Sequence, residues 1–151
     1  ETKTPFDCYH YRIIHQTFHG MRDVLHPIAD DSSTAVLPFH YHRLATADRI
    51  VVEACPSSTL KRLGLPHQRY KQTGRKPPDA IHRGTRQQIL RGVGRQMEIS
   101  PHRRRVIMQD PGGDALDAVL AGLGSWRAYC EDDHSLIAAH KRYPVEGRVY
   151  W

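Results

Sequence analysis

The sequence has few cysteines and lacks a long apolar run. Its three cysteines, Cys8, Cys55 and Cys130, lie far apart and form neither a CxxC pair nor an even disulfide framework. No apolar run reaches the roughly 18 residues that a transmembrane helix needs, and the first residues carry no signal-peptide pattern. We therefore expect an intracellular, cytoplasmic protein with reduced thiols and no membrane partner.

Acidic residues are outnumbered by basic ones. The 151 residues include 22 Lys and Arg against 16 Asp and Glu, which gives a formal net charge of +6. The basic residues cluster in LKRLGLPHQRYKQTGRK and in PHRRRVIM. Such a surplus favours a polyanionic partner such as DNA or RNA, although basic runs are also typical of a solvated surface. The length of the chain fits a single domain, residues 1–151, with a substantial core.

The pattern of apolar residues predicts a mixed α/β fold. Apolar residues at helical spacing predict a first helix from Thr4 to Leu25, ended by Pro27. Ile50–Val52 is the best strand candidate, and its continuous β-branched run predicts burial on both faces. Further elements are expected as an extended segment at 34–44, helices at 57–63, 79–96 and 110–129, a helical turn at 136–140 and a short strand at 146–151. This pattern contains only two or three strands. These are too few to pair the backbone N–H and C=O groups at both edges of a buried parallel strand.

Two acids stand in the predicted helix at 110–129. Asp114 and Asp117 are three residues apart and therefore share one helix face, which the small residues Ala121 and Gly124 continue. The core stripe is expected at Leu116, Val119, Leu120, Leu123 and Trp126. With Asp110 as N-cap and Pro111 at the first helical position, both acids fall inside the helix. If the helix instead began at Asp114, the helix dipole alone would stabilise both acids and no function would be needed.

A third carboxylate, Glu53, follows the predicted strand at 50–52. Ligands of open α/β sheets bind at the carboxyl ends of strands, although a charge at this place also fits a strand that emerges into solvent. Three carboxylates that converge from a strand end and a helix are a ligand set for Mg²⁺ or Mn²⁺. Two such ions can activate a water for phosphodiester hydrolysis, while the basic surplus holds the nucleic-acid backbone.

Residues 50–151 resemble a family of predicted nucleases with an RNase H-like fold, the DUF family numbered 429. The resemblance rests on Glu53 and Pro56, on Leu63-Gly64-Leu65, on Tyr70-Lys71 and on the Asp-Ala-Leu-Asp-Ala run at 114–118, followed by EGRVYW. The acids are also similar in layout to those of the RuvC-type branch, in which they bind two divalent metals. The resemblance implies that Glu53, Asp114 and Asp117 are catalytic metal ligands.

The chain departs from this family at its N-terminal side. No three-strand antiparallel meander with a first acidic residue precedes residue 50, and the chain begins with Glu1 rather than Met. We therefore expect the C-terminal part of an RNase H-like domain, with the sheet completed by a missing N-terminal segment, a second chain or a second copy in a homo-oligomer.

Two functions follow from these patterns. The first is a divalent-metal-dependent nuclease in which Glu53, Asp114 and Asp117 hold Mg²⁺ or Mn²⁺ and nucleic acid is contacted by Tyr70, Lys71, Arg75 and Lys76. The second is a non-catalytic nucleic-acid-binding or assembly module that retains the RNase H-like fold. The substrate is left open between DNA and RNA, and a small phosphoester is also compatible with the pattern.

Overall fold

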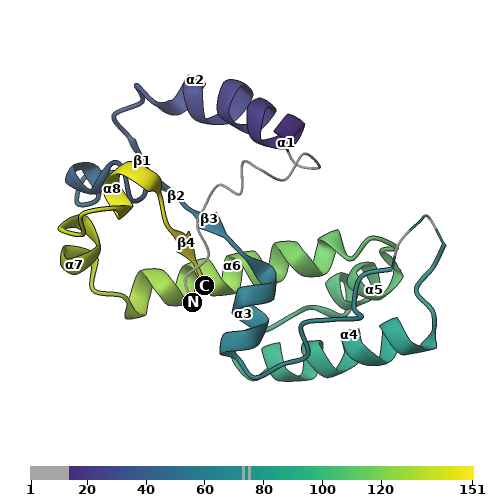
Figure 1. The fold of residues 1–151 in the computed structure, drawn as a ribbon. Helices are drawn as coiled ribbons and strands as arrows, with labels where there is room; N and C mark the ends of the chain where they lie inside the picture. The colour runs from purple at the N-terminus through teal and green to yellow at the C-terminus, as the bar shows by residue number, and fades with distance from the viewer. Residues whose placement is uncertain (1–13, 73, 75) are drawn as a thin grey trace. The chain divides into compact units, whose positions relative to one another are not determined.

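The computed structural model describes residues 14–72, 74 and 76–151, and these fall into two compact units. The first unit contains the described residues up to Glu53 together with Tyr129–Tyr150, and the second contains Ala54–Ala128 and Trp151. The described residues form a mixed α/β structure (Figure 1). Of these described residues, 55% are helical. This confirms the α/β class, whereas the RNase H-like fold over residues 1–151 stays a prediction.

Short elements make up the first unit. In chain order they are α1 (Ile14–His19), the π-helical η1 (Gly20–Leu25), α2 (His26–Ile28), β1 (Thr34–Val36), the 3-10 turn η2 (Tyr41–Arg43), β2 (Arg49–Val51), α7 (His134–Ala138), α8 (Tyr143–Glu146) and β4 (Val149–Tyr150). The strand β3 (Glu53–Ala54) starts at Glu53, the residue at which the first segment of this unit ends. It forms a two-stranded sheet with β4. The strands of the described residues are therefore few and short, as the sequence predicts.

The predicted first helix is present from Ile14 onward, and its earlier part lies outside the described residues. Pro27 does not end it, because this proline occupies an early position of α2 and the helical segment runs on to Ile28. The expected apolar face is also not a core face: Ile14 is 47% exposed and Phe18 57% exposed. Helical spacing thus identified the helix correctly but not its burial.

The buried strands of the first unit are β1 and β4 rather than the predicted strand at 50–52. β1 and β2 are parallel, with Ala35 opposite Ile50, and the connection between them runs through η2. Ala35 is fully buried, whereas Ile50 is 38% exposed, so burial of the β-branched run on both faces was wrong. A run of β-branched residues indicates extended backbone, but it does not by itself indicate that the strand is buried.

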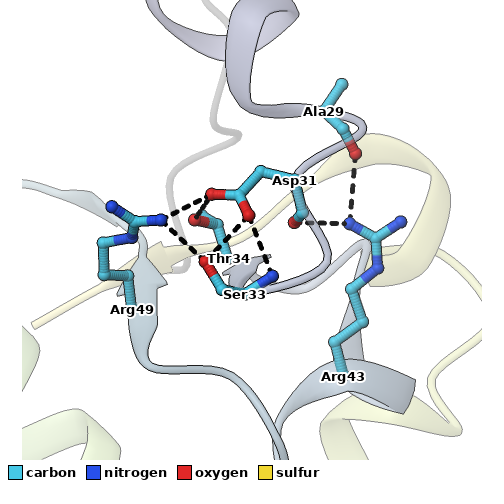
Figure 2. Close-up of polar contacts among 6 residues, drawn as sticks. All are labelled: Ala29, Asp31, Ser33, Thr34, Arg43 and Arg49. Carbon is cyan, nitrogen blue, oxygen red and sulfur yellow. Dashed lines mark hydrogen bonds and ion pairs between the residues drawn. The ribbon is translucent and has the colours of Figure 1, made fainter.

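The carboxylate of Asp31 connects the starts of β1 and β2. It accepts hydrogen bonds from the Ser33 amide at 2.9 Å, the Thr34 hydroxyl at 2.7 Å and Arg49 Nη2 at 2.7 Å (Figure 2). Arg43 donates to the backbone carbonyl of Asp31 at 3.2 Å. These donors favour the ionised carboxylate and lower the pKa of Asp31 to about 2, with the Thr34 hydroxyl as the largest cause.

Four helices build the second unit. They are α3 (Pro56–Arg62), α4 (Ala80–Val93), α5 (Pro101–Gln109) and α6 (Asp114–Glu131), of which α6 continues past Ala128 into the first unit. Buried side chains from these helices and from the segments between them form one cluster of Leu60, Tyr70, Ile89, Leu90, Val93, Ile99, Ile107, Leu116, Leu120 and Leu123. Within the described ranges, no helix is long and apolar enough to cross a membrane.

The ends of these helices follow local chemistry. Asp79, at the predicted start of the helix, caps α4 by accepting a hydrogen bond of 2.9 Å from the amide of His82. Gly64, with φ +64°, follows the end of α3 as predicted. Cys55 is the N-cap of α3, which starts one residue earlier than the predicted 57–63. Ser100 caps α5, in a region between 96 and 110 for which the sequence predicted no element.

The core stripe of α6 is partly as predicted. Leu116, Leu120 and Leu123 are buried, but Trp126 is 65% exposed and does not belong to the core. The small residues after the two acids suggest a shallow, uncrowded face, but this is wrong at Gly124, because a Cβ at this position would collide with the Thr59 hydroxyl of α3. The small residue is therefore there for close packing rather than for an open surface.

Candidate functional site at the start of helix α6

Helix α6 begins at Asp114, so Asp114 and Asp117 lie in its first turn. Asp110 does not occupy the N-cap position predicted for it, because α6 begins only at Asp114. Its carboxylate nevertheless accepts a hydrogen bond of 2.8 Å from the amide of Ala115, in the first turn of α6. Acids in a first helical turn gain about 0.3–1 kcal/mol each from the helix dipole. The structure therefore matches the alternative in which the helix itself accounts for the two acids.

Asp117 has two partners within the second unit. One carboxylate oxygen accepts a hydrogen bond of 2.9 Å from the Tyr70 hydroxyl, and the other forms an ion pair with Lys71. The side chain of Asp117 is 22% exposed and that of Lys71 is 46% exposed. The charge of Asp117 is thus neutralised by the chain itself.

The side chain of Asp114 is exposed and, among the described residues, has no hydrogen-bond or ion-pair partner. It differs in this respect from Asp117, three residues further on. Gly113, which precedes Asp114, has φ +83°, and an added Cβ there would approach Lys71 Cγ at 3.1 Å. Only glycine suits both the backbone conformation and the close approach of Lys71.

The residues predicted to contact nucleic acid have different surroundings. Tyr70 is 5% exposed and belongs to the core cluster, so its ring offers no stacking face. Lys71 lies beside it and pairs with Asp117. Lys76 is exposed in the loop before α4, whereas Arg75 lies outside the described residues. A packed tyrosine next to a surface lysine is the simpler of the two interpretations of the Tyr70-Lys71 pair.

The polar centre of the second unit is Arg86, which the sequence analysis missed. Its guanidinium is fully buried and donates to four backbone carbonyls, those of Tyr70 at 2.7 Å, Ile107 at 2.8 Å, Asp110 at 2.5 Å and Pro111 at 3.3 Å. Burial lowers the pKa of Arg86, and the nearby Asp110 carboxylate opposes this effect. Arg86 therefore joins α4 to the end of α5, the start of α6 and the segment that carries Lys71.

A sequence signal for Arg86 does exist. Arg86 stands three, four and seven residues before Ile89, Leu90 and Val93, which are the buried positions of α4. This spacing places the arginine on the core face of the helix. A charged residue on such a face has to find polar partners inside the protein.

Glu53 lies in the first unit, at the start of β3 rather than at the end of a buried strand. The residue is exposed, yet burial of part of its side chain raises the pKa of its carboxyl to about 7. Asp114 and Asp117 belong to the second unit. Among the described residues, no group of three His, Cys, Asp or Glu side chains is arranged to hold a metal ion. The three-carboxylate site for Mg²⁺ or Mn²⁺ stays a prediction.

Exposed arginines are the second polar feature of this unit. Arg83 and Arg91 on α4 and Arg103 and Arg105 on α5 are all exposed. We call these four residues the α4–α5 arginines. In the part of the chain that the structure describes, no carboxylate pairs with any of their side chains. Helices α4 and α5 contact each other.

No protein-family model, curated protein or solved structure matches the chain.

Proposed function

We propose that the second unit binds nucleic acid, with the α4–α5 arginines in contact with the phosphate backbone. The observation that carries this proposal is the exposure of four arginines that lack a carboxylate partner within the described residues. Guanidinium groups form paired hydrogen bonds with phosphate oxygens, and neutralising phosphates releases counterions. Arginines without an internal partner are available for such contacts.

The distribution of charge supports the same proposal. Residues 54–128 contain fourteen Lys and Arg against five Asp and Glu, whereas the remaining residues contain eight against eleven. The net positive charge of the chain therefore comes entirely from the second unit. A charge surplus confined to one unit favours polyanion binding by that unit.

The spacing on α4 adds a geometric argument. Arg83, Gln87 and Arg91 are four residues apart and all exposed, so they follow one face of the helix. Arg104 on α5 is different, because its Nε donates to the carbonyl of Ile99 at 3.4 Å and the side chain is only half-exposed. The arginines on either side of it remain exposed.

The test is fluorescence anisotropy with labelled single- and double-stranded DNA and RNA oligonucleotides over a series of salt concentrations. The double variant Arg103→Gln with Arg105→Gln should bind more weakly, and the slope of log Kd against log salt should fall by about 0.7–0.9 for each phosphate that is no longer neutralised. The matched control is Arg22→Gln with Arg142→Gln, which removes the same charge from two arginines of the first unit that pair with Asp23 and Glu146. Equal weakening in both double variants would show a net-charge effect and would contradict the proposal.

A second candidate function is the divalent-metal-dependent nuclease, and it is favoured by one observation. The Asp114 carboxylate is exposed, has no partner among the described residues and lies one helical turn from Asp117. Carboxylate oxygens are suitable ligands for Mg²⁺ or Mn²⁺. A cation that used Asp117 as well would have to replace Lys71 as its partner. When bound, such an ion would activate a water and stabilise the leaving oxygen of a phosphodiester.

Calorimetric titration of Mn²⁺ tests the nuclease candidate. Saturable binding that Asp114→Asn and Asp117→Asn abolish, and that the exposed control Asp30→Asn retains, would support it and justify a cleavage assay on labelled oligonucleotides. Glu53→Gln in the same titration tests the predicted third ligand. Nucleic-acid binding without Mn²⁺ binding or cleavage would favour the non-catalytic module.

A further inference from the structure

Trp126 on α6 is the most exposed large apolar side chain among the described residues of the second unit. The residue is 65% exposed, although helical spacing predicts that it belongs to the core stripe. An indole ring is flat and apolar, with a single N–H donor at its edge. A partner that covers the face of this ring removes a large apolar area from water, which favours binding.

The part of α6 that carries Trp126 lies beside the end of α4. Nη1 of Arg127, the next residue, donates to Gln96 Oε1 at 3.4 Å. Gly94, two residues before Gln96, lies against α5, because a Cβ added to Gly94 would be 3.1 Å from Arg104 Nη2. Trp126 therefore belongs to the region of the second unit in which the end of α4 meets α5 and α6.

The charge of this region is strongly positive. Arg91 and Arg95 are exposed at the end of α4 and just after it, and Arg103 and Arg105 are exposed on α5. Residues 91–109 contain five arginines and one acid, Glu98. An apolar protein surface that covered the indole ring would remove these charges from water without pairing them, which is costly. Phosphates would neutralise the same charges, so a nucleic acid suits both the ring and its surroundings.

We propose that the second unit binds single-stranded nucleic acid, with a base stacked on the indole ring of Trp126 and phosphates held by the neighbouring arginines. This inference rests on the nucleic-acid binding proposed above. Within a duplex each base is covered by its neighbours, so stacking on a protein ring requires an unpaired strand. Trp126 takes the stacking role that the sequence predicts for Tyr70, whose ring is buried. Every base has a stacking face, so we expect little sequence preference.

The test is fluorescence anisotropy with three labelled probes: oligothymidylate, the same strand paired with its complement, and oligouridylate. Trp126→Leu should weaken binding of the single strands by about tenfold or more and leave duplex binding unchanged. The slope of log Kd against log salt should stay that of the parent chain, because stacking neutralises no phosphate. Trp126→Phe retains a ring and should retain most of the affinity. The two single-stranded probes distinguish a DNA ligand from an RNA ligand.

Phe18→Leu is the matched control, because it removes an aromatic side chain that is 57% exposed in the first unit. It should leave the binding of all three probes unchanged. A second measurement leaves Trp126 in place. The chain has two tryptophans, so Trp126 is the source of all tryptophan fluorescence in a Trp151→Phe variant. Saturating oligothymidylate should quench this fluorescence by stacking, and the duplex should not.

Two results would overturn the inference. One is a Trp126→Leu variant that binds single strands as tightly as the parent chain, and the other is fluorescence that single strands do not quench. If Arg103→Gln with Arg105→Gln still weakened binding in that case, only the stacking role of Trp126 would fail and the proposed nucleic-acid binding would stand. Absence of binding to all three probes would overturn both.

Discussion

The hydroxyl of Tyr70 donates a hydrogen bond of 2.9 Å to the carboxylate of Asp117. Burial raises the pKa of Tyr70, and the Asp117 carboxylate adds to this effect, so the hydroxyl remains a donor. Together with Lys71, it satisfies a partly buried charge in the first turn of α6. A helix with a buried face therefore carries Asp117 without any need for a bound ion.

We expect Tyr70→Phe to lower the free energy of unfolding by about 1–2 kcal/mol, because the partly buried Asp117 loses a donor while the packed ring is retained. Urea denaturation measures this change. Tyr143→Phe is the control, since the Tyr143 hydroxyl has no hydrogen-bond partner within the described residues. Equal destabilisation by the two variants would show that the Tyr70 hydrogen bond contributes nothing.

Arg86→Met should destabilise the protein by about 3 kcal/mol or more, because it leaves four backbone carbonyls short of a donor. The control is Arg83→Met on the same helix, where the side chain is exposed and a change within about 0.5 kcal/mol is expected. Urea denaturation again provides the measurement. An Arg86→Met variant as stable as the parent would contradict the role of Arg86 at the centre of the second unit.

Glu53 should make stability depend on pH. The pKa of its carboxyl rises from an ordinary value of 4.5 to about 7 in the folded chain, so between these pH values the folded state binds more protons than the unfolded state. The free energy of unfolding contributed by Glu53 is therefore present below pH 4.5 and falls as pH rises toward 7. Thermal midpoints across this range should show the fall, and Glu53→Gln should remove it. Glu98→Gln, at an exposed position of the second unit, should leave it unchanged.

Asp31 should have the opposite pH dependence. Its pKa is lowered from 3.8 to about 2, mainly by hydrogen bonds from the Thr34 hydroxyl and from the hydroxyl and amide of Ser33. The unfolded state then binds more protons, so the stability due to Asp31 is present above pH 3.8 and is lost as pH falls through 2. Asp31→Asn should lower the free energy of unfolding at neutral pH, and it should reduce the loss of that free energy as the pH falls toward 2. The neighbouring, exposed Asp30→Asn should do neither, and a parallel loss in both variants would argue against the network in Figure 2.

The parts of the fold that sequence predicted correctly rest on neighbours along the chain. The helix predicted from residue 79 begins there, because the Asp79 carboxylate reaches an amide three residues ahead. Gly64 follows a helix end because it tolerates a positive φ. Leu116 and Leu120 share a buried face because they are four residues apart. Exposure was predicted less well, as Ile50 at 38% exposed and Trp126 at 65% exposed demonstrate. Helical periodicity identifies an apolar stripe, but only the packing of other elements decides how much of that stripe is covered.

The candidate site illustrates the same division. Two features can be predicted without the fold, because spacing and composition are local properties: Asp114 and Asp117 share a helix face, and basic residues gather between 54 and 128. The long-range contacts could not be predicted in this way. Asp117 meets Tyr70, 47 residues away, and Arg86 binds carbonyls of segments 16 to 25 residues distant. These partners are selected by the way four helices pack around one core. Hydrogen bonds between distant segments leave no periodic trace in the sequence, because each depends on geometry that exists only after folding.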